Sequence, residues 1–234
     1  MQVKLLHYTP LWVASKAIRK CWASEDKSDT CTYDASADPD GLEDTYEDGG
    51  VIIGPKDKAL IERVGNKNKH SSTLEHINYS FDIDGISRAC LQELARHRHA
   101  SLSVKSTRYT LKELKKESSF TSLGCNFSKA EKYIVLIDES YTNTCSIKAL
   151  EELRQLLIAG ISNDKAKYCL PEAYKTSLVL TVNARSLQNF LSLRTDKAAL
   201  WEIRDLANEI FNRLPDEHKY LFREFVKEYE KEED

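Results

Sequence analysis

The sequence predicts an α+β fold. Two observations predict this class. Some segments are short apolar or alternating runs, which are typical of strands, and others are longer with apolar residues at helical spacing. The two kinds of segment follow one another in irregular order. The chain has 234 residues, of which 41% are hydrophobic and 30% are charged. This length and composition suit one or two compact domains with a real hydrophobic core, and they exclude global disorder.

The N-terminal part begins with a predicted strand at 3–7 and a predicted helix at 11–22, where apolar residues recur near helical spacing. Residues 34–49 are rich in acids and turn formers, which predicts a long acidic surface loop. The loop contains an Asp-Pro-Asp-Gly sequence, but the ligand pattern of a calcium-binding loop does not line up there.

A strand that leads into a helix is predicted next. Residues 77–83 alternate strictly between apolar and polar, which is typical of a half-buried strand. Asp84 then offers an N-cap for a helix that runs towards Arg96. The remaining predicted elements are a strand at 133–137, helices at 146–159 and 162–170, a strand at 178–182, a helix capped by Asn183, and helical structure from 197 onwards.

Charge and composition exclude several classes of protein. The net charge of −3 argues against a surface that binds nucleic acid or anionic membrane as a whole. Because no apolar stretch approaches the roughly 18 to 20 residues of a membrane-spanning helix, and the N-terminus has no signal-peptide pattern, we expect a cytoplasmic protein. Six dispersed cysteines without metal-ligand spacing predict buried, reduced thiols and no metal site.

The segment 88–108 concentrates positive charge. Five cations face a single acid there, a local excess of +4 (5 − 1) in an acidic protein. Guanidinium groups beside Ser and Thr hydroxyls suit phosphate, so a phosphorylated small molecule is the predicted ligand. A solvated basic turn without a ligand is the alternative that composition leaves open.

The order of these residues resembles the flavin-dependent thymidylate synthases. Arg-His-Arg at 96–98, then seven residues and Ser106, is similar to that family's RHR-x7-S signature. The segments 70–76 and 183–194 resemble two further family segments, and the matching blocks run from about Ser72 to Ile203.

The resemblance implies one domain over 1–234, with a central, mostly antiparallel sheet and flanking helices, and a homotetramer. It implies the reductive methylation of dUMP to dTMP by a methyltransferase. Methylenetetrahydrofolate is then the carbon donor, and FAD, reduced by NADPH, is the hydride source. In that family no enzyme cysteine attacks the uracil, and Ser106 binds phosphate.

The family's site residues carry over by position. The positions that match FAD-binding residues are Ser72, Glu75, Arg96, His97, Arg98, Asn183, Arg185 and Asn189. Those that match dUMP-binding residues are Glu93, Arg96, Val104, Lys105, Ser106, Thr107, Arg108, Lys167 and Arg194. Arg194 matches the arginine that activates the uracil ring, where a fixed cation stabilises the negative charge that the ring gains.

The residues themselves support a ligand face on the helix that follows Asn183. Arg185 and Asn189 are four positions apart and lie on one helical face, opposite the apolar Leu187, Phe190 and Leu191. His70 is a further candidate for the flavin and folate region, with a structural role as the equal alternative.

Three positions depart from the family pattern. Glu93 stands where Gln is frequent, Val104 where many members have an acid, and Lys167 where an Arg is usual. Lys keeps the charge but loses bidentate geometry, so the affinity or the pose of dUMP is expected to differ.

Two other functions are kept open. A non-catalytic flavin- or nucleotide-binding protein of the same fold would result if these departures had removed turnover. An RNA-binding regulator that uses the basic cluster is disfavoured by the net charge and by the lack of an RRM or KH signature.

Overall fold

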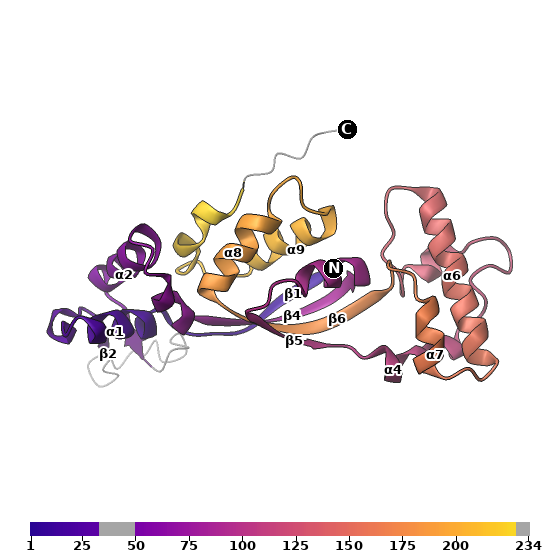
Figure 1. Ribbon diagram of the computed structural model, residues 1–234, viewed down its shortest axis with the longest axis horizontal. Coiled ribbons are helices and arrows are strands. Elements are labelled where there is room, and N and C mark those ends of the chain that lie inside the picture. Colours follow the sequence, from indigo (N-terminus) through magenta and orange to yellow (C-terminus); the bar gives the residue numbers. More distant parts are fainter. Residues whose placement is uncertain (33–49, 228–234) are drawn as a thin grey trace, which may run out of the picture. The chain divides into compact units, whose positions relative to one another are not determined.

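The computed structural model describes residues 1–32 and 50–227 (Figure 1). The predicted acidic loop at 34–49 lies outside these residues. The strands are β1 (Gln2–Tyr8), β2 (Cys31–Thr32), β3 (Val51–Ile52), β4 (Asn78–Ser87), β5 (Ala100–Val104) and β6 (Lys175–Asn183). The α-helices are α1 (Leu11–Cys21), α2 (Pro55–Ile61), α3 (Arg88–Leu94), α4 (Thr107–Thr110), α5 (Phe127–Ala130), α6 (Ser140–Ile158), α7 (Asn163–Ala166), α8 (Ala184–Arg194) and α9 (Trp201–Asn212).

Shorter turns of helix join these elements. The 3₁₀ turns are η1 (Glu25–Lys27), η5 (Ser71–His76), η6 (Leu111–Lys116), η7 (Lys167–Cys169), η8 (Lys219–Leu221) and η9 (Arg223–Phe225), and η4 (Glu62–Lys67) is a π-helical turn. None of the described helices is long and apolar enough to span a bilayer.

An antiparallel sheet with strand order β1-β4-β6-β5 forms the centre of the fold, and β2 pairs with β3 in a separate two-stranded ladder. The predicted α+β class is therefore confirmed. The alternation predicted at 77–83 is also confirmed, because Tyr79, Phe81 and Ile83 in β4 are fully buried.

The chain divides into two compact units. Unit 1 consists of 1–4, 82–98 and 102–180, and unit 2 of 5–81, 99–101 and 181–234. All four strands of the larger sheet, β1, β4, β5 and β6, contribute residues to both units.

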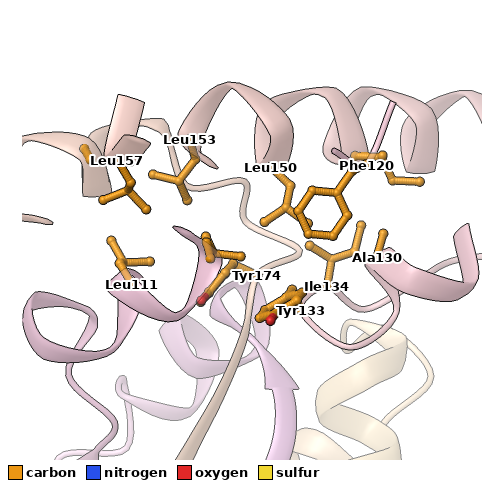
Figure 2. Packing of buried hydrophobic residues seen from close by; sticks show 12 residues of the cluster. Leu111, Phe120, Ala130, Tyr133, Ile134, Leu150, Leu153, Leu157 and Tyr174 are labelled. Atoms are coloured by element: carbon orange, nitrogen blue, oxygen red, sulfur yellow. The ribbon is translucent and has the colours of Figure 1, made fainter. Parts of the chain in front are cut away.

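The core of unit 1 is built on α6. Figure 2 shows Leu150, Leu153 and Leu157 pointing from this helix towards Ile134 and Tyr174. The same helix carries a buried ion pair: the Arg154 Nη2 lies 2.8 Å from the Glu151 Oε1, and the other Glu151 oxygen accepts from the backbone N–H of Phe120 at 2.9 Å. The same buried cluster includes Leu111, Leu114, Phe120, Ala130 and Tyr133, so the segment 111–134 packs against α6.

Aromatic rings form part of the core of unit 2. Tyr79 lies edge-on to Phe222 and to His218, and the Tyr79 hydroxyl is 2.7 Å from the His218 Nδ1. The side chains of all three residues are fully buried. The helical structure predicted from 197 onwards begins only at Trp201, with α9, and this helix ends at Asn212, after which the chain continues in short 3₁₀ turns.

The predicted N-cap at Asp84 is wrong. Strand β4 continues through Asp84 to Ser87, and the Ser87 Oγ accepts the backbone N–H of Cys90 at 3.0 Å, so Ser87 caps α3. The helix also ends earlier than predicted, at Leu94, which leaves Arg96 in the turn that follows. Ser and Asp are both favoured N-cap residues, but Asp84 lies inside strand β4, so Ser87 is the residue that precedes the helix.

The predicted strand at 133–137 is also wrong. Only Ile134 pairs there, in an isolated antiparallel bridge with Tyr174. The apolar side chain of Ile134 is buried in the core of unit 1, so its hydrophobicity reflects that packing and not a place in a sheet. The predicted helix at 146–159 is present but begins at Ser140. Of the six cysteines, only Cys90 is buried, so the expected burial of the thiols is wrong for the rest, and among the described residues none of the six is joined in a disulfide.

Candidate functional site

The FAD-binding residues predicted near 72–75 and 183–189 come together in unit 2. Turn η5 and helix α8 are in contact, and the backbone N–H of Ala184 donates to the Ile77 carbonyl at 2.8 Å. The Asn183 Oδ1 accepts from the Ser186 N–H at 2.8 Å, which confirms the predicted cap. The start of α8 is therefore fixed directly beside the end of η5.

Helix α8 has the two faces that the sequence predicts. Leu187, Phe190 and Leu191 are buried, whereas Arg185 and Asn189 are exposed. Beside the apolar face, the buried Gln188 amide donates to the Leu221 carbonyl at 2.8 Å and so ties the helix to the C-terminal turns. The polar face is thus held rigidly towards solvent.

Glu75 and Arg185, 110 positions apart, form an ion pair in which the Arg185 Nη1 and the Glu75 Oε1 are 2.6 Å apart. About half of each side chain is exposed. Ser72 lies exposed on the same turn as Glu75, and His70 is exposed at its start. Turn η5 and the start of α8 therefore expose a guanidinium, a carboxylate and a hydroxyl.

The Arg-His-Arg triplet lies in unit 1, in the turn between α3 and β5. The backbone N–H of His97 donates to the Leu94 carbonyl at 3.1 Å, which closes the end of α3. Arg96 and Arg98 are exposed, and the Arg96 Nη1 lies 3.6 Å from the Glu93 Oε2. Two guanidinium groups are therefore available to an anionic ligand.

The predicted phosphate-binding residues follow β5 in unit 1. The backbone N–H of Lys105 donates to the Ser177 carbonyl of β6 at 2.8 Å, and α4 begins directly after Ser106. Val104, Lys105, Ser106 and Arg108 are exposed, and Thr107 is half-buried. Helix α7 contacts α4, and Lys167 begins the exposed turn η7 at the end of α7.

Arg194 is the last residue of α8 and is half-buried in unit 2. The next residue fixes this end of the helix: the Thr195 hydroxyl donates to the Leu191 carbonyl at 2.7 Å and accepts the Lys227 N–H at 2.9 Å. Arg194 thus belongs with the predicted flavin residues of η5 and α8 in unit 2. The triplet and the phosphate loop belong to unit 1.

Sequence reasoning missed two polar residues of α7. The Asp164 Oδ1 accepts from the Arg108 Nε at 2.7 Å, and the Asn163 Nδ2 donates to the Arg108 carbonyl at 2.6 Å. Both residues are far from Arg108 in the sequence, so no local pattern predicts their contacts with it, although both lie within four positions of Lys167. A cavity of about 360 Å³ in unit 2, beside Trp12 and Arg19, is lined by none of the predicted site residues.

The chain belongs to the flavin-dependent thymidylate synthase family. Residues 4–218 match the family model of the thymidylate synthase complementing proteins. A flavin-dependent thymidylate synthase of Campylobacter jejuni is 57% identical over 222 residues, which cover 95% of this chain and 96% of that protein. One of Wolinella succinogenes is 56% identical over 222 residues, covering 95% and 97%.

A solved structure agrees with these sequences. The crystal structure of thymidylate synthase X from Helicobacter pylori with FAD and dUMP superposes with a TM-score of 0.84 at 50% identity, covering 97% of this chain and 100% of that chain. The resemblance found in the sequence and the fold that it implied are therefore both confirmed.

Proposed function

We propose that this chain converts dUMP to dTMP by reductive methylation, with FAD as its cofactor. The observation that carries the proposal is the Glu75–Arg185 pair beside the exposed face of α8, in a chain similar over nearly its whole length to flavin-dependent thymidylate synthases. The similar Helicobacter pylori enzyme was crystallised with FAD and dUMP.

The exposed donors fit a flavin dinucleotide. Arg185 and Asn189 offer a guanidinium and an amide on one face of α8, and Ser72 adds a hydroxyl from η5. Guanidinium, amide and hydroxyl donors of this kind suit a pyrophosphate or a polar ring edge, and Arg96, His97 and Arg98 offer such donors separately in unit 1. FAD, once reduced, supplies the hydride. Glu75 orients Arg185, and Asn183 holds the start of the helix.

The segment from Lys105 to Arg108 fits the phosphate group of dUMP. Lys105, Arg108 and Lys167 supply positive charge, and Ser106 and Thr107 supply hydroxyls and backbone N–H groups. Charge-assisted hydrogen bonds of this kind are the strong ones, and they orient the nucleotide. Orientation matters here because the reaction needs C5 of the uracil close to the carbon donor.

Arg194 stabilises the negative charge that the uracil ring gains at N3 and O4 when C5 becomes nucleophilic. Arg194 is half-buried at a helix end held by Thr195, so little reorganisation accompanies the reaction. In unit 1, Glu93 and Arg96 are further proposed nucleotide contacts, and the Arg96 Nη1 lies 3.6 Å from the Glu93 Oε2.

The three departures from the family pattern define what differs in this chain. Val104 puts an exposed apolar side chain where many family members have an acid. Lys167 offers a point charge rather than a fork, and Glu93 offers only acceptors where Gln offers both donors and acceptors. We expect these changes to alter how tightly dUMP binds rather than the reaction.

The finer assignments made from the sequence belong to the same proposal. They are NADPH as the reductant, methylenetetrahydrofolate as the carbon donor, a homotetramer, a cytoplasmic location and a single domain over 1–234.

Substitution of Arg194 by Ala tests the proposed mechanism. The variant should fold and hold FAD but lose about 100- to 1,000-fold in turnover, the usual cost of removing one such donor. Arg213→Ala is the matched control, because Arg213 is an exposed arginine that pairs only with Glu209 on α9 among the described residues. Near-normal turnover of Arg194→Ala would contradict the assigned role.

A second outcome separates catalysis from binding alone. Wild-type protein that holds FAD but shows no chemistry dependent on dUMP would be a non-catalytic flavin- or nucleotide-binding protein. Val104 and Lys167 would then be the first residues to revert to an acid and to Arg.

A further inference from the structure

Arg108 is held at both its backbone and its side chain by two consecutive residues of α7. The Asp164 Oδ1 accepts from the Arg108 Nε at 2.7 Å, and the Asp164 Oδ2 is 3.4 Å from the Arg108 Nη2. The Asn163 Nδ2 donates to the Arg108 carbonyl at 2.6 Å. Together these contacts fix where α4 presents the guanidinium.

The ion pair is too exposed to contribute much to stability. The side chains of Arg108 and Asp164 are 61% and 59% exposed, and pairs of this kind typically contribute about 0.2 to 1 kcal/mol. An arginine that is free to rotate loses considerable conformational entropy when a ligand fixes it. A partner that restricts the side chain beforehand reduces that loss on binding.

The geometry leaves one edge of the guanidinium open. Asp164 engages the edge formed by Nε and Nη2, and among the described residues no hydrogen bond engages Nη1. Lys167 follows Asp164 by three positions, about one helical turn, so α7 and η7 supply both the partner of Arg108 and a second cation. An anion can therefore approach the Nη1 of Arg108 without displacing Asp164.

We propose that Asp164 is a positioning residue for the phosphate group of dUMP, acting through Arg108. The proposal rests on the proposed function, in which Arg108 contacts that phosphate. Two effects of Asp164 oppose each other, because its carboxylate orders Arg108 but also repels a phosphate dianion. The sign of the change in KM for dUMP on removing the carboxylate decides which effect dominates.

Steady-state kinetics of the full-length, FAD-loaded enzyme test the proposal. Asp164→Ala should raise KM for dUMP about two- to fivefold, the factor that an exposed ion pair of this kind supplies, and leave kcat unchanged. Asp164→Glu should restore part of the loss. The isosteric Asp164→Asn, which keeps one acceptor oxygen, should lie between Ala and wild type.

Glu209→Ala removes a partly exposed carboxylate of α9 that pairs with Arg213, and it should change neither kcat nor KM for dUMP. In an Arg108→Ala background, Asp164→Ala should not raise KM for dUMP any further, because the side chain that Asp164 positions has been removed. An unchanged or lower KM for Asp164→Ala, or an effect that persists without Arg108, would overturn the proposal. If Arg108→Ala itself leaves KM unchanged, the fault lies instead with the assignment of Arg108 to the phosphate.

Discussion

His218 should make the stability of this protein depend on pH. Its side chain is fully buried, its Nδ1 lies 2.7 Å from the Tyr79 hydroxyl, and among the described residues its Nε2 has no hydrogen-bond partner. The nearest carboxylate oxygen in an ion-pair contact, on Glu217, is 3.8 Å from Nε2. Burial, with a smaller contribution from the charge of Lys58, lowers the pKa of His218 from 6.5 to about 4.

The direction of the pH dependence follows from the protonation of His218 in the folded and in the unfolded chain. Above pH 6.5 the imidazole is neutral in both states, and its full contribution to stability is present. As the pH falls from 6.5 towards 4, the unfolded chain binds a proton that the folded protein refuses, and stability is lost. A pKa difference of roughly 2.5 corresponds to about 3 kcal/mol, most of it lost by pH 4.5.

Urea unfolding of the FAD-loaded protein at fixed concentration, between pH 7.5 and pH 4.5, measures this loss. His218→Asn can keep a polar atom near Tyr79 but cannot titrate, so it should be less stable than wild type at pH 7.5 and should lose roughly 2 to 3 kcal/mol less over the range. Carboxyl groups such as Glu151, whose pKa is lowered to about 2, act below about pH 4.5 and are common to both proteins. Parallel pH profiles would refute the reasoning.

Three further changes test the packing and the caps, each by urea unfolding near pH 7.5. Ser87→Ala should cost about 1 kcal/mol, because it removes the cap of α3, whereas Asp84→Ala should stay within about 0.5 kcal/mol; equal costs would contradict the assignment of the cap. Leu153→Ala should cost about 2 to 5 kcal/mol, and Leu123→Ala, at a fully exposed leucine, close to nothing. Glu151→Gln should cost several kcal/mol by leaving its buried arginine partner without a counter-charge, and a loss below 1 kcal/mol would contradict that account.

Local patterns predict α8 well, and the reason is physical. Asn183 is a strong cap, and the apolar residues that follow it recur at helical spacing, so propensity and burial agree. Strand β4 is predicted for the same reason, since its alternating side chains are buried on one face.

The sequence misleads where packing overrides the local pattern. The apolar run at 133–137 resembles a strand, but Ile134 is buried in the core around α6 and pairs only in a single bridge. Strand β5 is missed for a different reason. Its sequence Ala-Ser-Leu-Ser-Val does alternate between apolar and polar residues, but it lies inside the basic, hydroxyl-rich segment 88–108, whose charge pattern predicts a ligand-binding turn rather than a strand.

The residues of the candidate site could also be predicted only in part from the sequence. Its residues were found by resemblance to family motifs, which specify positions far apart in the sequence such as Glu75 and Arg185. The contact of Asp164 with Arg108 belongs to no motif and joins residues 56 positions apart, so only the folded chain reveals it.

Release of label from C5-tritiated dUMP tests the central claim most directly. Purified protein is supplied with FAD, NADPH and methylenetetrahydrofolate, and each is omitted in turn. The proposed function predicts release of tritium that requires all of them. No release from folded protein that holds FAD would contradict the claim and leave a flavin-binding protein without synthase activity.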